Sequence, residues 1–355
     1  MPTTAAAPPL SPALQDALAT VELHPGDSGG TPAVTVAGHR VEAATPRELR
    51  VALGNVLYEQ WHAGIRDAGD GPVRGPRRDT ALEERLAAQV PHTTTRADAV
   101  LRRPATDSTP AVVELGRVLV SVPADAVHAV PGTGPGPGPG PGPNLGLSLG
   151  PGDPVQVEHP ALRPALSPGF LLVDGAQGFA RHVGRQEVLR LYVHVAEAAA
   201  APAVWGALLR ELAGLAVPYR AKVLSRSWSY PRRDAVVVYL CAEHAAVASR
   251  LAAALAHTAG IADDVSVFAH RLAPGTAVAW DPRDPRPART ERSFGQHRAA
   301  AVADGVVRHL TGPDDDTGLA ARVAAALREA SVLPAEPARN TTSPAFTATP
   351  PAREV

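Results

Sequence analysis

Cysteine, lysine and aromatic residues are scarce in this sequence of 355 residues. The single cysteine, Cys241, excludes a disulfide or a cysteine-based zinc site within the chain. Aromatic residues make up 4% of the sequence, so Ala, Val and Leu must build most of the core. No apolar run reaches the ~18–20 residues of a bilayer-spanning helix. The first residues also lack the pattern of a signal peptide. We therefore expect a cytoplasmic protein that does not bind a membrane.

Neither sign of charge is in excess, because 34 basic residues face 35 acidic residues. This balance argues against a nucleic-acid-binding face or a polybasic membrane anchor. The 13 histidines include no H-E-x-x-H pair and no second ligand at metal spacing. We predict neither a metal site nor a cofactor.

Lysine occurs once, at Lys222, whereas the other 33 basic residues are arginines. Arginine keeps its charge at any physiological pH, but lysine can offer a neutral amine when its surroundings lower its pKa. Lys222 is therefore the first candidate for proton-transfer chemistry. The alternative is a surface charge left over in an arginine-rich sequence.

The length predicts two domains, and a low-complexity Gly/Pro segment at residues 131–154 suggests the boundary between them. Such a composition does not build a core. Residues 13–130 are predicted to form a mostly helical region with β-hairpins, and residues 155–332 an α+β domain. The flanking stretches 1–12 and 333–355 are predicted to be disordered tails.

Hydrophobic periodicity predicts the secondary structure. Hairpins are expected at residues 33–41 and 111–122, around Gly38 and Gly116. Thr45 and Glu48 form a capping-box pattern at the start of a helix. The remaining expectations are helices at 80–90, 201–215, 242–259, 294–310 and 317–332, strands at 187–195, 217–224, 234–241 and 265–269, and a loop at 273–292. The result is an α+β fold with helices on one side of a mixed sheet.

The strand that carries Lys222 is dense in cations, with Arg220 on the same predicted face and Arg226, Arg232 and Arg233 following. Guanidinium groups bind phosphate in a bidentate manner, and neighbouring positive charges lower the pKa of a lysine. This arrangement suits abstraction of a Cα proton with loss of phosphate.

An earlier strand carries Tyr192 and His194 on one face, and either group is a candidate acid for the leaving phosphate. Tyr239 is a further candidate in the next strand. The alternative is a solvated, arginine-rich edge strand with buried tyrosines.

Several segments together resemble the HopA family of type III effector-like proteins. PYRAK at 218–222 and SFGQHR at 293–298 are the most specific. The others are LYEQWHAGI at 57–65, LYVH at 191–194, DAVVVYL at 234–240 and LAPGTAVAWDP at 272–282. High-GC bacterial relatives occur beside ribosomal-peptide pathways, including those of class V lanthipeptides and thioamitides.

This pattern is itself similar to phosphothreonine lyases and to the lyase domains of lanthipeptide synthetases. By that resemblance, Lys222 matches the general base. The position of the acid falls nearest Tyr192, with His194 two residues on. Arg298, which follows His297, resembles the late phosphate-gripping arginine. The remaining candidates for the phosphate site are Arg226, Arg232 and Arg233.

The resemblance implies a phosphoserine or phosphothreonine lyase in peptide maturation, which would form dehydroalanine or dehydrobutyrine. Its partners would be a phosphorylated precursor peptide, a separate kinase and a cyclase. The alternative is a non-catalytic, effector-like protein that scaffolds such partners. Convergence of the Lys222 amine and at least two guanidinium groups on one cleft would favour the lyase.

Overall fold

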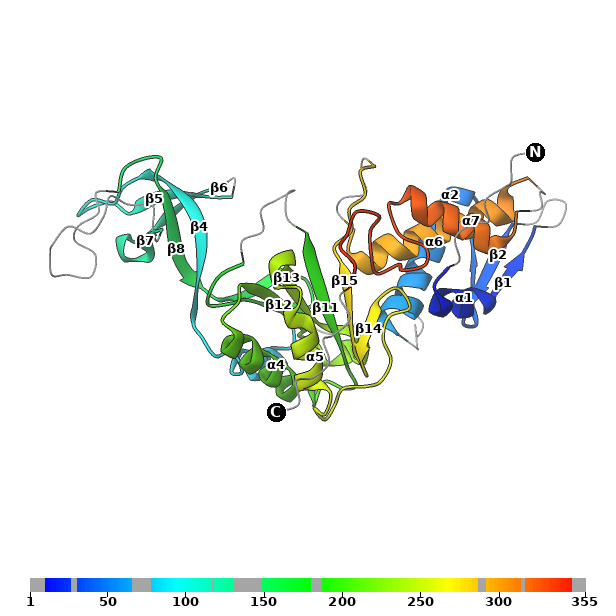
Figure 1. Ribbon diagram of the computed structural model, residues 1–355, viewed down its shortest axis with the longest axis horizontal. Helices are drawn as coiled ribbons and strands as arrows, with labels where there is room; N and C mark the ends of the chain where they lie inside the picture. The colour runs from blue at the N-terminus through cyan, green and yellow to red at the C-terminus, as the bar shows by residue number, and fades with distance from the viewer. Residues whose placement is uncertain are drawn as a thin grey trace.

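The computed structural model describes residues 10–26, 31–65, 78–116, 118–130, 149–179, 187–286, 292–313 and 317–346. The fold is α+β, as predicted. Its centre is a seven-stranded sheet in the order β14-β15-β11-β13-β12-β10-β9 (Figure 1). The strands are β9 (Leu162–Ser167), β10 (Phe170–Asp174), β11 (Val188–Val195), β12 (Tyr219–Leu224), β13 (Arg232–Cys241), β14 (His270–Ala273) and β15 (Thr276–Trp280).

Neighbouring strands of this sheet all run antiparallel in the described residues, so the prediction of a mixed sheet is wrong. The order β11, helix, β12 in the sequence is typical of a parallel crossover. Here β13 lies between β11 and β12 and pairs antiparallel with both. Strand β15 was also missed, because Thr276–Trp280 is a buried strand inside the predicted loop. Residues 265–269, predicted as a strand, precede β14 without forming one.

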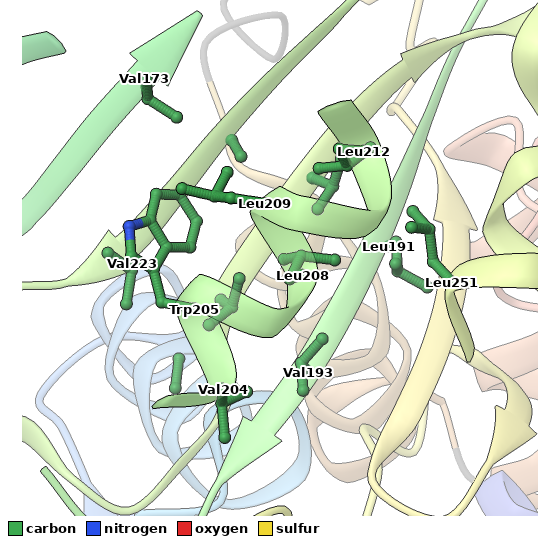
Figure 2. Close-up of a cluster of buried hydrophobic side chains, with 14 of the residues drawn as sticks. Val173, Leu191, Val193, Val204, Trp205, Leu208, Leu209, Leu212, Val223 and Leu251 are labelled. Atoms are coloured by element: carbon green, nitrogen blue, oxygen red, sulfur yellow. The ribbon is translucent and has the colours of Figure 1, made fainter. Parts of the chain in front are cut away.

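Helices α4 (Ala201–Leu215) and α5 (Val247–Leu255) cover one face of the sheet. Figure 2 shows Leu208 of α4 on the side of Val193 of β11, and Trp205 of the same helix next to Val223 of β12. These helical positions follow the 3.6-residue period of an amphipathic helix. Each such side chain contributes about 1.5–3 kcal/mol when fully buried.

A second helical layer covers part of the opposite face, so the expectation of helices on one side is wrong. It contains α2 (Pro46–Leu57), the π-helix η1 (Tyr58–Ala63) and α6 (Phe294–Thr311). Tyr192 of β11 and Val237 of β13 share a core with Phe294 of α6. Helix α7 (Leu319–Glu329) packs on α6.

The N-terminal part joins this second layer. Helix α1 (Pro12–Ala19) is followed by a three-stranded sheet of β1 (Val21–His24), β2 (Ala33–Val36) and β3 (His39–Glu42). The β2–β3 hairpin and the capping box of Thr45 with Glu48 are confirmed. Leu49, Leu53 and Leu57 of α2 lie in one core with α6 and α7. The N-terminal residues are therefore continuous with the predicted second domain.

A separate five-stranded sheet has the order β6-β5-β4-β8-β7. Its strands are β4 (Thr94–Arg103), β5 (Ala111–Leu115), β6 (Val118–Val122), β7 (Val127–Ala129) and β8 (Pro154–Pro160), and α3 (Thr80–Ala87) precedes it. Strands β7 and β8 pair with each other although the Gly/Pro segment lies between them in sequence. That segment, of which 131–148 lie outside the described residues, thus connects two neighbouring strands. The prediction that it divides two domains is wrong, and so is a mostly helical region 13–130.

The predicted C-terminal tail contributes to the core over residues 333–346. The backbone N–H of Trp280 donates to Ala338 O at 2.9 Å, and Asn340 Nδ2 donates to Asp281 O at 2.7 Å. At the other end, Leu10 is buried and Ser11 N donates to Pro334 O. Residues 1–9 and 347–355 lie outside the described residues. No helix within the described ranges has the length and hydropathy to cross a bilayer.

Candidate functional site

The predicted site residues lie in rows across the sheet face opposite α4 and α5. Lys222 pairs with Leu172 of β10 and with Val237 of β13, and Val237 pairs with Tyr192 of β11. Directly opposed residues share a face, so Lys222 and Tyr192 lie on the same face two strands apart, or about 10 Å. Arg220 forms the adjacent row, so the expectation that Arg220 and Lys222 share a face is confirmed.

Tyr192 lies under the second helical layer. Its ring makes an edge contact with His62 of η1, at 5.2 Å between centroids, and lies 5.9 Å from Phe294 of α6. The side chain is 3% exposed, and burial raises the pKa of its phenol above the usual value. A substrate on the open part of the sheet would not meet the phenol directly, which argues against the predicted role as an acid.

His194, the other predicted acid, is also buried. Its Nδ1 lies 3.0 Å from Asp264 O, and its backbone N–H donates to Gly275 O. The register of β11 shifts between Val193 and Val195, which sets His194 against the loop before β14. Its observed contacts are therefore with loop backbone.

Arg232 belongs to a buried polar cluster with Tyr58, His62, Asp234 and Ser266. Arg232 Nε donates to Asp234 Oδ1, and Nη2 donates to Asp234 Oδ2, both at 2.8 Å. Arg232 Nη2 also donates to the Tyr58 hydroxyl at 2.8 Å. His62 Nδ1 lies 2.9 Å from Ser266 Oγ, and its Nε2 lies 3.8 Å from Asp234 Oδ2.

Burial and charge set the protonation states of this cluster. Burial lowers the pKa of His62 to about 4, against the opposing effect of Asp234, and it raises the pKa of Tyr58 to about 12. Burial alone would raise the pKa of Asp234, but the charge of Arg232 and its hydrogen bonds hold that pKa at about 2. At neutral pH, Arg232 is therefore neutralised by Asp234 beside an uncharged His62. Sequence reasoning missed the importance of His62 because its partners come from distant segments.

Arg233 supports the end of η1. Its Nη1 donates to Gln60 O at 3.0 Å, and its Nη2 lies 3.4 Å from Asp264 Oδ2. The guanidinium passes close to Gly64, where an added Cβ would lie 2.9 Å from Arg233 Nε. Gly64 has a φ of +74°, which only glycine adopts readily, and it ends the π-helix.

Arg298 is fully buried, at 0% exposure. Its guanidinium donates to Pro337 O at 2.7 Å and to Asn340 Oδ1 at 2.9 Å, and it lies 2.8 Å from His297 Nδ1. Burial lowers the pKa of Arg298 to about 9. His297 Nε2 in turn lies 3.0 Å from Asp284 Oδ2. The predicted phosphate contact of Arg298 and the candidate role of His297 are therefore replaced by an internal network.

Arg220 and Tyr239 also have internal partners. Arg220 donates twice to Asp174, at 2.6 and 3.0 Å. The Tyr239 ring lies under the guanidinium of Arg190, at 5.1 Å, and Arg190 pairs with Asp281. The convergence of several free guanidinium groups that the sequence predicted does not occur among these residues.

Lys222 and Arg226 differ from these arginines, because neither forms an ion pair with a carboxylate within the described residues. The Lys222 amine lies over the Phe170 ring at 4.1 Å from its centroid. The Arg226 guanidinium lies against Gly169, 3.8 Å from an added Cβ. Both side chains are half-buried and approach the turn between β9 and β10. We call Lys222, Arg226, Phe170 and Leu172 the Lys222 shelf.

The described residues contain no candidate metal site. Among the described residues, no group of three or more histidine, cysteine or acidic side chains is placed to hold an ion. The lone cysteine, Cys241, is buried at the end of β13.

Comparison with known proteins places the chain in a family. The sequence model of the HopA1 effector protein family matches residues 161–339, just over half of the chain. The chain therefore belongs to the HopA1 effector protein family. The matched range contains the whole seven-stranded sheet and α4 to α7.

Two solved structures resemble the chain. They are effector proteins from Pseudomonas syringae pv. tomato strain DC3000 and Pseudomonas syringae pv. syringae strain 61. The first is 17% identical with a TM-score of 0.35, and the second 16% identical with a TM-score of 0.36. Each match covers 48% of this chain and 62% of the other, so this chain spans less than two thirds of either effector. No curated protein matches the chain.

Proposed function

We propose that this protein binds a phosphorylated serine or threonine of a partner peptide on the Lys222 shelf. The observation that supports this proposal is a contrast between the predicted cations. Arg220 and Arg232 form ion pairs with Asp174 and Asp234. Lys222 and Arg226 form no ion pair with a carboxylate in the described part of the chain, and Lys222 interacts with Asp234 only at longer range.

The shelf suits a phosphate on physical grounds. A phosphorylated side chain carries about −1.5 to −2 charges at neutral pH and three acceptor oxygens. Lys222 offers a compact ammonium group and Arg226 a planar fork of donors. Phe170 holds the amine in place through a cation–π contact. A bound dianion would interact favourably with two half-buried cations that have no carboxylate in direct contact.

The finer proposal is that the chain also eliminates the phosphate. In this step Lys222 first releases the proton of its ammonium group to solvent. The resulting amine takes the Cα proton of the phosphorylated residue, and the electron pair of that C–H bond forms the Cα=Cβ double bond. The Cβ–O bond breaks, and inorganic phosphate leaves with the bonding pair toward Arg226. Lys222 then holds the proton, and the product is dehydroalanine or dehydrobutyrine. A separate kinase would supply the phosphorylated precursor peptide, and a cyclase would consume the dehydrated one.

A non-catalytic role is the second candidate, and it is the one favoured by the lack of convergence, among the described residues, of at least two guanidinium groups on Lys222. Arg232, Arg233 and Arg298, three of the arginines predicted to hold phosphate, are engaged in internal contacts. A binding protein that scaffolds a kinase, a cyclase or the precursor peptide needs only the shelf. The two candidates share the binding step and differ in whether Lys222 acts as a base.

The test uses the full chain with Lys222→Arg and Lys222→Ala, and with Arg250→Ala on the exposed side of α5 as a control. Synthetic peptides with one phosphoserine or phosphothreonine are followed by fluorescence anisotropy for binding and by mass spectrometry for phosphate loss. Lys222→Ala should weaken binding about tenfold or more. Lys222→Arg should retain binding and abolish elimination, because arginine cannot supply a neutral amine.

Other outcomes separate the candidates. If the wild type binds the phosphopeptides without releasing phosphate, the non-catalytic scaffold is supported and the lyase activity is excluded. If Lys222→Ala binds the phosphopeptides as tightly as the wild type, the proposal that the Lys222 shelf binds phosphate is overturned.

A further inference from the structure

The five-stranded sheet has an apolar face that contributes one wall of a groove. Val113 and Leu115 of β5, Val120 and Val122 of β6, and Val157 of β8 line this wall. Pro160, Leu162, Pro164 and Leu166, at the end of β8 and along β9, line the other. The cavity measures about 590 Å³, within the range of ~300–1,000 Å³ that is usual for ligand sites. An open apolar groove of this size indicates a binding surface.

Among the described residues, strand β6 lies at an edge of its sheet, and its own sequence lacks the usual protection against pairing. Its sequence, Val-Leu-Val-Ser-Val over 118–122, contains no charge and no proline. The other outer strands of the two large sheets do carry such features: β9 contains Pro164, β14 begins with exposed His270 and Arg271, and β7 has only three residues. A bare apolar edge readily accepts another strand. The occupant that fits this edge is therefore an extended peptide.

One residue that lines the groove, Arg163, lies in the same row of the sheet as Lys222. Arg163 lines the groove and pairs with Leu172, which pairs with Lys222 on the next strand. These three residues form one row on one sheet face, so the groove begins about 10 Å from Lys222, the span of two strand spacings. An extended chain covers that distance with about three residues.

We propose that the groove binds an extended apolar segment of the peptide whose phosphorylated residue lies on the Lys222 shelf. The segment pairs with β6, and its alternate side chains fill the space between Val120 and Leu166. This inference rests on the proposed function, because the shelf defines the neighbouring anchor. It adds the specificity that a phosphate alone would not provide.

The test compares two exposed apolar residues. Leu166 is 55% exposed and lines the groove, whereas Val51 of α2 is 60% exposed and neither lines the groove nor belongs to β6. The probes are synthetic peptides with one phosphothreonine, a four-residue Gly/Ser spacer and the segment Val-Thr-Val-Thr-Val on either side. Matched peptides replace the valines by serine or lack the phosphate. Binding to the full chain is measured by fluorescence anisotropy.

Leu166→Asp should weaken binding of the valine peptide about tenfold, to the affinity of the serine peptide, because a charge replaces the apolar contact. Val51→Asp should leave the affinity unchanged. N-methylation of alternate backbone nitrogens in the valine segment should also weaken binding, because a methylated nitrogen cannot donate to β6. If the wild type binds the valine and serine peptides with equal affinity, the inference that the groove binds an apolar segment is overturned.

The outcomes also separate this inference from the proposed function. If Lys222→Ala leaves binding unchanged while Leu166→Asp abolishes it, the groove stands and the phosphate shelf fails. If Lys222→Ala weakens peptide binding and Leu166→Asp does not, phosphate binding on the shelf is supported and peptide binding in the groove is overturned. If Leu166→Asp instead converts a dimer to a monomer in sedimentation without affecting the peptides, the groove binds a second copy and the inference is overturned.

Discussion

Arg298 Nη2 donates a hydrogen bond to Asn340 Oδ1 at 2.9 Å and so ties the start of α6 to the C-terminal segment. The same guanidinium reaches Pro337 O and His297. A residue that resembles a phosphate ligand in the sequence thus holds two parts of the core together.

Arg298→Ala should destabilise the protein by about 3 kcal/mol or more. It leaves the buried Pro337 carbonyl without its donor, removes one of the two donors to Asn340 Oδ1 and leaves a large cavity. Urea denaturation measures the loss. The control is Arg250→Ala, which should change stability by less than about 0.5 kcal/mol. A near-neutral effect of Arg298→Ala would contradict the structural role.

Removal of residues 333–355 should impair folding, although the sequence suggested a disordered tail. The truncation deletes the contacts of Ala338 with Trp280 and of Asn340 with Arg298. Removal of residues 347–355 alone is the control, and it should leave the unfolding midpoint unchanged. Equal midpoints for both truncations would show that the segment is dispensable.

Gly295→Ala should cost about 1–3 kcal/mol through overpacking. An added Cβ would lie 2.1 Å from Cδ2 of the buried His62, which has little room to move. Gly214→Ala in α4 is the matched helical control, because an added Cβ there meets nothing within 4 Å. That control should stabilise the chain by up to about 1 kcal/mol. Similar effects of both substitutions on the urea midpoint would count against the packing of η1 on α6.

Stability should fall as the pH drops from 6.5 toward 4. The pKa of His62 is about 4 in the folded protein and 6.5 as its usual value. In this window the unfolded chain binds a proton that the folded chain does not, so acidification favours unfolding, by up to about 3 kcal/mol. Burial likewise lowers the pKa of His297 to about 4. His62→Gln should therefore remove about half of the pH dependence of the unfolding free energy. An unchanged slope would show that His62 is not the group responsible.

Arg226→Ala should weaken phosphopeptide binding about tenfold and leave stability nearly unchanged, because Arg226 has no carboxylate partner in the described residues. Arg233→Ala is the informative comparison. It removes the contact with Gln60 O and should lower the urea midpoint while sparing the affinity of the folded protein. If Arg226→Ala instead lowers the urea midpoint and Arg233→Ala weakens phosphopeptide binding, Arg226 is the structural residue and Arg233 the binding residue.

Local patterns predicted many of the elements well. The capping box at Thr45, the hairpin around Gly38 and the amphipathic pattern of α4 each depend on residues close in sequence. The buried strand Thr276–Trp280 was missed, because a short apolar run beside proline and aspartate residues is ambiguous without knowledge of its neighbours. The pairing of β7 with β8 was missed because a Gly/Pro segment separates them in sequence.

That Lys222 and Arg220 share one face of a strand follows from the amino-acid sequence, since alternation is a property of any extended backbone. The α+β class and the family resemblance also follow from local patterns. Which cations have internal partners depends on the folded arrangement of distant segments. Asp174, Asp264 and Tyr58 lie far along the chain from the arginines that they contact, and folding alone brings them together. Long-range contacts of this kind leave no local pattern in the sequence. The five cations between residues 220 and 233 therefore look alike in the sequence, although some form internal ion pairs in the structure and others do not.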